Sequence, residues 1–298
     1  MSVNSSAQSR LKKGSKQLDL RKDREKGKYR LGVVNFINTA PLLIPLREHG
    51  DMEGWKIIEG SPSQLNKMLQ KGEIDVGLIS SYAYAKDFRD YFVLRDFCIS
   101  ATGTVGSVVL YSRYPIYELS EKTICLTEQS ATSINLLYII LEYFNGLRPG
   151  YVTGRFKDFL ENHDLAAYLA IGDEALRIKK SNGEFYSYDL ASIWYEATSL
   201  PFVFALWAVR KDSRLCGTAQ FSILKDRLKQ AYSQGAKRLD EISARVSGRI
   251  PMSKVECLAY LKGIEFDLSG LKLRGLGHFF KLLVQIGRLS EMPDVVEV

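Results

Sequence analysis

The sequence predicts an α/β fold of two lobes joined by a hinge, followed by a C-terminal helical region. Mostly apolar runs at residues 74–80 and 166–171 are typical of strands that are buried on both faces of a parallel sheet. Amphipathic helical patterns separate such runs, which is the order of β-α-β units. Two further apolar runs, at 107–112 and 202–209, fall where the first and the second series of units end.

The first lobe is expected to open with β-α-β units. Their strands are expected at residues 31–36, 56–59 and 74–80. Asn38 precedes Pro41 just after the first strand, and a polar residue before a proline in a first helical turn marks a helix start. After the second strand, Ser61 is expected to cap the next helix and Gln64 to complete a capping box. Local signals thus predict where these helices begin.

The second lobe is expected to repeat this pattern, with strands at 123–127 and 166–171 around a long apolar helix at 132–144. We interpret the runs at 107–112 and 202–209 as paired strands that cross between the lobes. The predicted division is a tail at 1–28, lobe 1 at 29–113 and 202–298 with the C-terminal helices, and lobe 2 at 114–201. Two lobes on a hinge, with a cleft at the strand ends, are the architecture of type II periplasmic-binding proteins.

The basic character of the chain belongs to its first residues. The net charge is +7; residues 1–30 hold ten Lys or Arg and three acids, and the remainder holds 31 of each sign. A nucleic-acid-binding protein needs a basic face on the fold itself, so we expect no nucleic-acid partner. Residues 1–28 are polar and are expected to be disordered, with a partner-binding basic arm as the less favoured alternative.

We expect no membrane partner, no metal and a cytoplasmic location. No run reaches the roughly 18 apolar residues of a membrane span, and residues 1–28 lack the apolar core of a secretory signal. The cysteines and histidines are dispersed, which suits free thiols in a reducing compartment and disfavours a metal site. They are Cys98, Cys125, Cys216 and Cys257, and His49, His163 and His278.

Candidate binding residues stand at two junctions. Ser130, Thr132 and Ser133 lie at the predicted start of the long helix, where free amides and hydroxyls suit a carboxylate or phosphate. The alternative is that Ser130 or Thr132 only caps the helix. In the loop before the run at 107–112, Gly106 lets the backbone approach a ligand and Ser107 is expected to point its hydroxyl into the cleft. A plain turn is the alternative there.

Other polar side chains follow predicted strand ends, where ligands gather in open α/β sheets. Asn38 is expected to contact a ligand, to cap its helix, or to do both. Ser80, Ser81 and Tyr82 are expected to donate hydrogen bonds to a ligand. For Asp173 a helix cap is favoured over a substrate contact, and Asp189 is expected to cap the helix that follows it.

Several kinds of chemistry lack their motifs in this sequence. No Ser/His/Asp or Cys/His arrangement, phosphate loop or dinucleotide fingerprint is visible. Any reaction is therefore expected to depend on hydrogen bonds, positioning and electrostatics.

Several segments match one family when they are read together. They are VNFINTAPL at 34–42, SPSQL at 61–65, GEIDVGLISSYAYA at 72–85, GTVGSVVLYS at 103–112, SATSINLL at 130–137, IGDEAL at 171–176, DLASIWYEATSLPFVFALWAVR at 189–210 and LGHFFKLLVQIGRL at 276–289. In this order they resemble the chorismate dehydratases of the futalosine route to menaquinone biosynthesis. The resemblance covers about residues 29–290.

The resemblance implies a lyase with the binding-protein fold and no cofactor. Its small-molecule substrate would be chorismate, from which loss of water gives 3-[(1-carboxyvinyl)oxy]benzoate. Catalytic roles fall on Asn38, which would orient the departing hydroxyl or the side-chain carboxylate, and on Ser107, which would hydrogen-bond one carboxylate. The turn of Ser130, Thr132 and Ser133, with the helix amides, would hold the other. No His or Glu stands out as a base, so our hypothesis is that the enolpyruvyl carboxylate takes the ring proton.

Two alternatives remain. A 1,4-dihydroxy-6-naphthoate synthase-like enzyme of the same pathway would, by its own family pattern, need a cleft histidine, and the histidines here are placed away from strand ends. A non-catalytic small-anion-binding protein would be expected to carry a secretory signal. The oligomeric state and the role of the basic tail are not predicted.

Overall fold

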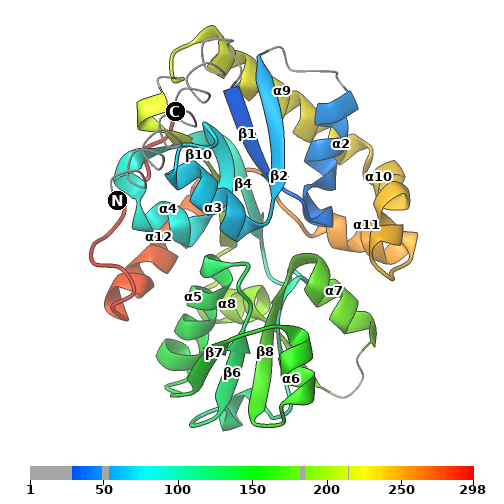
Figure 1. Ribbon diagram of the computed structural model, residues 1–298, viewed down its shortest axis with the longest axis vertical. Helices are drawn as coiled ribbons and strands as arrows, with labels where there is room; N and C mark the ends of the chain where they lie inside the picture. Colours follow the sequence, from blue (N-terminus) through cyan, green and yellow to red (C-terminus); the bar gives the residue numbers. More distant parts are fainter. Residues whose placement is uncertain (1–28, 49–53, 182–184, 214) are drawn as a thin grey trace, which may run out of the picture.

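The computed structural model describes residues 29–48, 54–181, 185–213 and 215–298. The tail predicted at residues 1–28, and His49, lie outside these ranges. Figure 1 shows two α/β lobes, one above the other, and each lobe is built on one five-stranded sheet. The predicted two-lobed α/β fold is confirmed.

In the first sheet four strands run in one direction and one strand, β10, runs against them, in the order β2-β1-β3-β10-β4. The bounds are Trp55–Gly60 (β2), Tyr29–Val34 (β1), Val76–Ser80 (β3), Phe202–Arg210 (β10) and Tyr91–Ala101 (β4). β1 runs parallel to β2 and β3, whereas β10 runs antiparallel to β3 and β4. Every residue of β3 is buried, as its apolar sequence predicts.

Three helices connect the strands of this sheet. They are α2 (Ala40–Glu48), α3 (Pro62–Gln70) and α4 (Ser81–Lys86). The predicted capping box at the start of α3 is confirmed, because Ser61 Oγ accepts from the Gln64 amide at 3.3 Å and Gln64 Oε1 accepts from the Ser61 amide at 2.9 Å. These bonds satisfy donors that a helix start leaves open.

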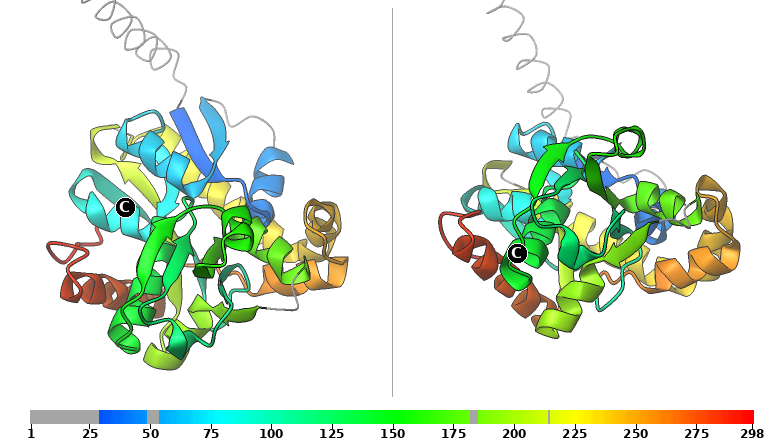
Figure 2. Two further views of the ribbon diagram at one scale, coloured as in Figure 1. Left: turned by 60° about the horizontal axis from the view of Figure 1, so that its bottom comes forward. Right: turned by 90° about the horizontal axis from the view of Figure 1, so that it is seen from below.

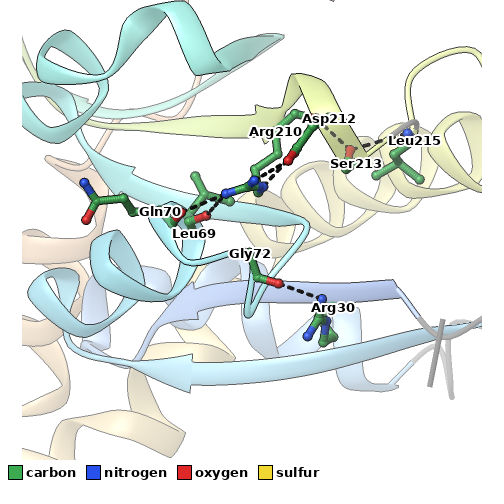
Figure 3. Close-up of polar contacts among 8 residues, drawn as sticks. All are labelled: Arg30, Leu69, Gln70, Gly72, Arg210, Asp212, Ser213 and Leu215. Carbon is green, nitrogen blue, oxygen red and sulfur yellow. Dashed lines mark hydrogen bonds and ion pairs between the residues drawn. The ribbon is translucent and has the colours of Figure 1, made fainter. Parts of the chain in front are cut away.

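Two arginines bind carbonyls at the opposite end of α3 (Figure 3). Arg210, the last residue of β10, donates to the carbonyls of Leu69 and Gln70 at 2.9 and 2.8 Å. Arg30 on β1 donates to the carbonyl of Gly72 at 2.9 Å. A helix C-terminus leaves carbonyls unsatisfied and favours cations, so these contacts hold α3 against the sheet.

The second sheet repeats the arrangement in the order β7-β6-β8-β5-β9. The strands are Gly150–Thr153 (β7), Thr123–Leu126 (β6), Leu165–Ile171 (β8), Val108–Ser112 (β5) and Tyr186–Asp189 (β9), and the helices are Ala131–Tyr138 (α5), Phe156–Glu161 (α6), Gly172–Ser181 (α7) and Leu190–Thr198 (α8). The long helix predicted at 132–144 is α5, continued by one π-helical segment at Ile139–Phe144.

The two predicted crossing strands do not pair with each other, and that part of the prediction is wrong. β5 pairs with β8 and β9 in the second sheet, while β10 pairs with β3 and β4 in the first. An apolar run buried on both faces fits the middle of either sheet, so its composition does not reveal its neighbours. The chain passes between the sheets at 102–107 and 199–201, and we propose these segments as the lobe boundaries.

The C-terminal region is helical, as predicted. It contains α9 (Ala219–Lys237), α10 (Leu239–Val246), α11 (Lys254–Lys262) and α12 (Gly270–Gln285). Short 3₁₀ turns along the described chain lie at Ile37–Thr39, Phe88–Asp90, Ile116–Glu118, Lys211–Ser213 and Ser247–Arg249. Figures 1 and 2 show α10 and α11 on one side of the molecule and α12 on the other. α9 packs so closely on α2 that a Cβ at Gly235 would fall 1.7 Å from the carbonyl oxygen of Pro41. Within the described ranges, no helix is long and apolar enough to span a membrane.

Candidate active site

An enclosed pocket lies between the lobes, at the carboxyl ends of parallel strands from both sheets. Its polar lining consists of Asn38, Ser80, Ser107, Ser130 and Ser133, and its apolar walls include Val34, Phe36, Leu78, Ile99, Ile171 and Phe204. Five of the predicted site residues therefore come together from separate parts of the chain.

The pocket is uncharged. None of the described residues that line it is an Asp, Glu, Lys, Arg or His. An anion bound here must be held by hydroxyl and amide donors, which act strongly where water is excluded. The donors that remain open therefore decide what this pocket binds.

Ser107 is held in place from two sides and is 3% exposed. The carboxylate of Asp189, which caps α8 as predicted, also accepts from the amides of Val105 and Gly106 at 3.3 and 2.6 Å. The Tyr260 hydroxyl donates to Ser107 Oγ at 3.0 Å. Because Ser107 Oγ accepts this bond from the protein, its own proton remains available to a ligand.

Ser80 has the same character in the first lobe. Its Oγ caps α4 by accepting from the Ala83 amide at 3.2 Å, and it also accepts from Asn66 Nδ2 at 3.2 Å. The Ser80 amide donates back to Asn66 Oδ1 at 3.1 Å. With both acceptor positions of Oγ in use, the Ser80 hydroxyl proton is a second open donor.

Ser130 and Ser133 form a pair at the start of α5. Ser130 Oγ accepts from the Ser133 amide at 3.2 Å, so Ser130 is the helix cap, as one of the alternatives predicted. The two hydroxyl oxygens are 2.9 Å apart. One hydroxyl proton joins them, and the other is a third open donor, whichever serine carries it.

Asn38 supplies an acceptor. Its Oδ1 is buried and has no hydrogen-bond partner among the described residues. Asn38 lies inside the 3₁₀ turn Ile37–Thr39, and no side-chain cap bond forms there, so the predicted cap role is wrong. A buried amide oxygen without a partner is costly, and a ligand hydroxyl in the pocket would satisfy it.

The other predicted residues do not line the pocket. The Gly106 amide is bound to Asp189, as described above. Thr132 Oγ1 accepts from the Tyr82 amide at 2.9 Å, and Asp173 Oδ1 accepts from the Ile37 amide at 2.9 Å. Both of these bonds run from the second lobe to the first, and we call them the cross-cleft contacts. The two lobes are thus closed on each other.

Asp173 directly follows the pocket residue Gly172 in the sequence. It is 7% exposed, and Arg249 lies 3.7 Å from its Oδ2. Burial raises the pKa of Asp173, against the lowering effect of the Ile37 amide and of Arg249. The favoured sequence interpretation, a helix cap, is replaced by the cross-cleft contact with Ile37.

Two supporting residues, Asn66 and Tyr260, were not predicted. Asn66 lies on α3, only 14 positions from Ser80, and a polar residue on a helix beside a strand end is a signal that could have found it. Tyr260 lies 153 positions from Ser107, and no local pattern reports that contact.

The described thiols and imidazoles lie outside the pocket. Cys98, Cys125 and Cys257 are buried and free, as predicted, and burial raises the pKa of Cys98 to about 12. His163 is exposed, and His278 lies on α12 beside the ring of Trp194, where burial lowers its pKa. The described part of the chain contains no group of three His, Cys, Asp or Glu that could hold a metal ion.

A second, more open hollow runs along α12. It is lined by Arg274, His278 and Lys281 among others. It lies away from the carboxyl ends of the sheets, where α/β folds bind their ligands, so we assign the site to the enclosed pocket.

Solved structures similar to this chain confirm the binding-protein fold. A protein of Archaeoglobus fulgidus has a TM-score of 0.73 at 17% identity, over 88% of this chain and 99% of that one. The alkanesulfonate-binding protein of Xanthomonas axonopodis, bound to MOPS, has a TM-score of 0.67 at 16% identity, over 91% and 99%. At such identities the likeness concerns the fold alone.

Sequence comparison identifies the family. A chorismate dehydratase of Thermus thermophilus is 31% identical over 273 residues, which is 86% of this chain and 95% of that protein. A chorismate dehydratase of Campylobacter jejuni is 28% identical over 205 residues, or 67% and 76%. The model of a family described as menaquinone biosynthesis matches residues 29–285. The chain therefore belongs to the menaquinone-biosynthesis family.

Proposed function

We propose that this protein is a chorismate dehydratase, which removes water from chorismate to give 3-[(1-carboxyvinyl)oxy]benzoate on the futalosine route to menaquinone. The observation that carries the proposal is the 31% identity to a protein of that activity over nearly its whole length. We also infer a cytoplasmic place of action, which the biosynthetic family supports.

The hydrogen-bonding groups of the pocket suit this substrate. Chorismate carries two carboxylates and one ring hydroxyl, and the pocket offers open donors together with the unpartnered Asn38 Oδ1. We assign one carboxylate to Ser107 and Ser80, the other to the Ser130–Ser133 pair with the first amides of α5, and the ring hydroxyl to Asn38. Hydrogen bonds from neutral donors to a carboxylate are charge-assisted, so several of them together can stabilise such a dianion.

The reaction needs only proton transfer. The ring C–H bond beside the ether oxygen breaks, its electron pair forms the new ring double bond, and the neighbouring C–O bond breaks. The departing hydroxyl and the proton leave as one water, and the ring becomes aromatic. Asn38 would orient the departing hydroxyl, and Ser107 would hold the substrate against the strand ends, so that positioning lowers the barrier.

The proton acceptor is the substrate itself in this account. The described pocket lining contains no titratable side chain, so no protein base contacts the ring. We propose that the enolpyruvyl carboxylate takes the ring proton and delivers it to the departing hydroxyl. Asp173 directly follows the pocket residue Gly172, so its substitution is the test of a protein base against this account.

The test is to mix the purified protein with chorismate and to follow the proton NMR spectrum. The proposed activity replaces the ring-diene signals with those of a meta-substituted benzoate that keeps its enolpyruvyl group. A solute carrier would shift the chorismate signals without converting them. A naphthoate-forming enzyme would leave them unchanged, and either result would overturn the proposal.

A further inference from the structure

We propose that Tyr260 is a positioning residue, which orients Ser107 so that the serine hydroxyl proton points at the substrate. The inference rests on the proposed function and names a residue outside the pocket on which that function depends. Tyr260 belongs to α11, in the C-terminal helical region, and lines a separate surface hollow rather than the pocket. It therefore acts through Ser107.

The contact between the two residues is direct and well confined. The Tyr260 hydroxyl lies 3.0 Å from Ser107 Oγ, and Ser107 is 3% exposed. The Tyr260 ring also lies close to the segment at 102–107, since a Cβ at Gly106 would be 3.7 Å from Tyr260 Cδ2. The ring and the hydroxyl thus contact the loop and the serine that the loop carries.

In this hydrogen bond the phenol is the donor and Ser107 Oγ the acceptor. Burial raises the pKa of Tyr260, so the hydroxyl keeps its proton at physiological pH and is able to donate. A serine hydroxyl rotates freely unless a neighbour fixes it, and it carries only one proton. When Tyr260 supplies the bond that Ser107 accepts, the Ser107 proton is directed away from the phenol, and Ser107 is one of the residues that line the pocket.

The rest of the loop is fixed independently of Tyr260. Asp189 binds the amides of Val105 and Gly106, and the Ser107 carbonyl accepts from the Gly172 amide at 2.7 Å. The backbone at Ser107 is therefore held whether or not the phenol is present. Removal of the Tyr260 hydroxyl should let the Ser107 hydroxyl rotate freely while leaving the loop backbone in place.

The test is a double-mutant cycle on chorismate turnover with Tyr260→Phe, Ser107→Ala and the double variant. Loss of one oriented hydrogen bond corresponds to about a tenfold change, so Tyr260→Phe should lower kcat/KM about tenfold. In the Ser107→Ala background the same change should have no further effect, because the hydroxyl has nothing left to orient. A purely structural role would give the same loss in both backgrounds and would overturn the inference.

Two further variants distinguish a loss of Ser107 orientation from a loss of folding. Tyr232→Phe is the matched control, since Tyr232 is another partly buried tyrosine, bonded to Trp207 Nε1 at 3.0 Å and remote from the pocket, and its kcat/KM should stay within about twofold of wild type. If Tyr260→Phe fails to fold, Tyr260→4-aminophenylalanine keeps a donor at the same reach. It should retain most of the wild-type kcat/KM, and a full loss with a native melting temperature would contradict the inference.

The outcomes also separate this inference from the proposed function. A wild-type protein that leaves chorismate unconverted overturns both. A wild-type protein that converts chorismate, with additive losses in the cycle, overturns the role of Tyr260 alone.

Discussion

The two lobes share one strand pattern but use their strand ends differently. In the first sheet β1 has parallel neighbours on both sides, and the antiparallel strand β10 lies next to β3. In the second sheet β6 takes the place of β1, and the antiparallel strand β5 lies next to β8. At the end of β3, Ser80 bonds within its own lobe and keeps its proton for the pocket. After β8, Asp173 instead binds the amide of Ile37 in the opposite lobe.

The start of α5 shows the same division within one turn. Ser130 and Ser133 bond to each other and line the pocket, whereas Thr132 between them accepts from Tyr82 across the cleft. Polar residues at strand ends therefore belong to two groups. The pocket serines offer donors to a ligand, and the cross-cleft contacts hold the lobes closed. Substitutions in the two groups should differ in what they change.

The largest effect is expected for Asn38→Asp. The change replaces a neutral amide by a carboxylate in a pocket whose described lining has no cation, and the substrate is a dianion. Like charges in contact cost several kcal/mol, so kcat/KM should fall at least about a hundredfold. The measurement is steady-state formation of the aromatic product. Asn162→Asp, at an exposed position, is the control, and equal rates for the two variants would remove Asn38 from the site.

A smaller loss of activity is expected for Ser80→Ala, and the adjacent Ser81 serves as the comparison. Ser80→Ala removes a pocket donor and should lower kcat/KM roughly tenfold. Ser81→Ala removes a hydroxyl that donates to the Val203 carbonyl at 2.7 Å inside the first lobe. It should cost about 1–3 kcal/mol of unfolding free energy and leave turnover unchanged. Activity and chemical denaturation of both variants check the pair, and the reverse pattern would contradict the assignment.

Thr132→Val should act on closure of the cleft. It keeps the shape of the side chain and removes the acceptor of the Tyr82 amide. Loss of about 1 kcal/mol from the closed state should raise KM about fivefold with little change in kcat. Thr153→Val, on the exposed edge strand β7, is the matched control. A fall in kcat at constant KM would place Thr132 among the groups that act on the reacting atoms.

Asp173→Asn should have the smallest effect on turnover. The amide oxygen can still accept from Ile37, and in this account no protein carboxylate acts as base. Burial raises the pKa of Asp173, so its ionised form lowers the stability of the folded state above that pKa. The Asn variant should therefore be no less stable than wild type at pH 7, and the difference should fade as the pH falls below the ordinary value of 3.8, where both states are protonated.

Melting curves between pH 3 and 8 and binding of chorismate check this prediction. Abolished turnover with binding intact would identify Asp173 as the base and would end the substrate-assisted account.

The sequence predicts the residues of the pocket better than it predicts how the two lobes close on each other. Asn38, Ser80, Ser107, Ser130 and Ser133 each stand beside a strand end or helix start, and the topology of α/β sheets brings such positions together. The cross-cleft contacts depend on how far one lobe turns toward the other, and no local pattern records that angle. Thr132 was predicted as a substrate ligand or a helix cap, and Asp173 as a helix cap rather than a substrate contact, but both contact the opposite lobe.

The same reasoning explains the error in the fold. The runs that became β5 and β10 were correctly predicted as strands, but their partners were not. Strand composition reports burial on both faces, whereas pairing depends on residues distant in sequence. The contact between Tyr260 and Ser107, 153 positions apart, lies beyond sequence patterns for the same reason.

The central claim is that chorismate binds between the lobes and is held there by uncharged donors. The most direct measurement is a crystal structure of Asn38→Ala soaked with chorismate, since this variant should bind the substrate but convert it slowly. The account predicts a ligand in the enclosed pocket, with carboxylate oxygens within hydrogen-bond distance of Ser107 Oγ and of the Ser130–Ser133 pair. A ligand bound only in the cationic hollow along α12, beside Arg274 and Lys281, would contradict it.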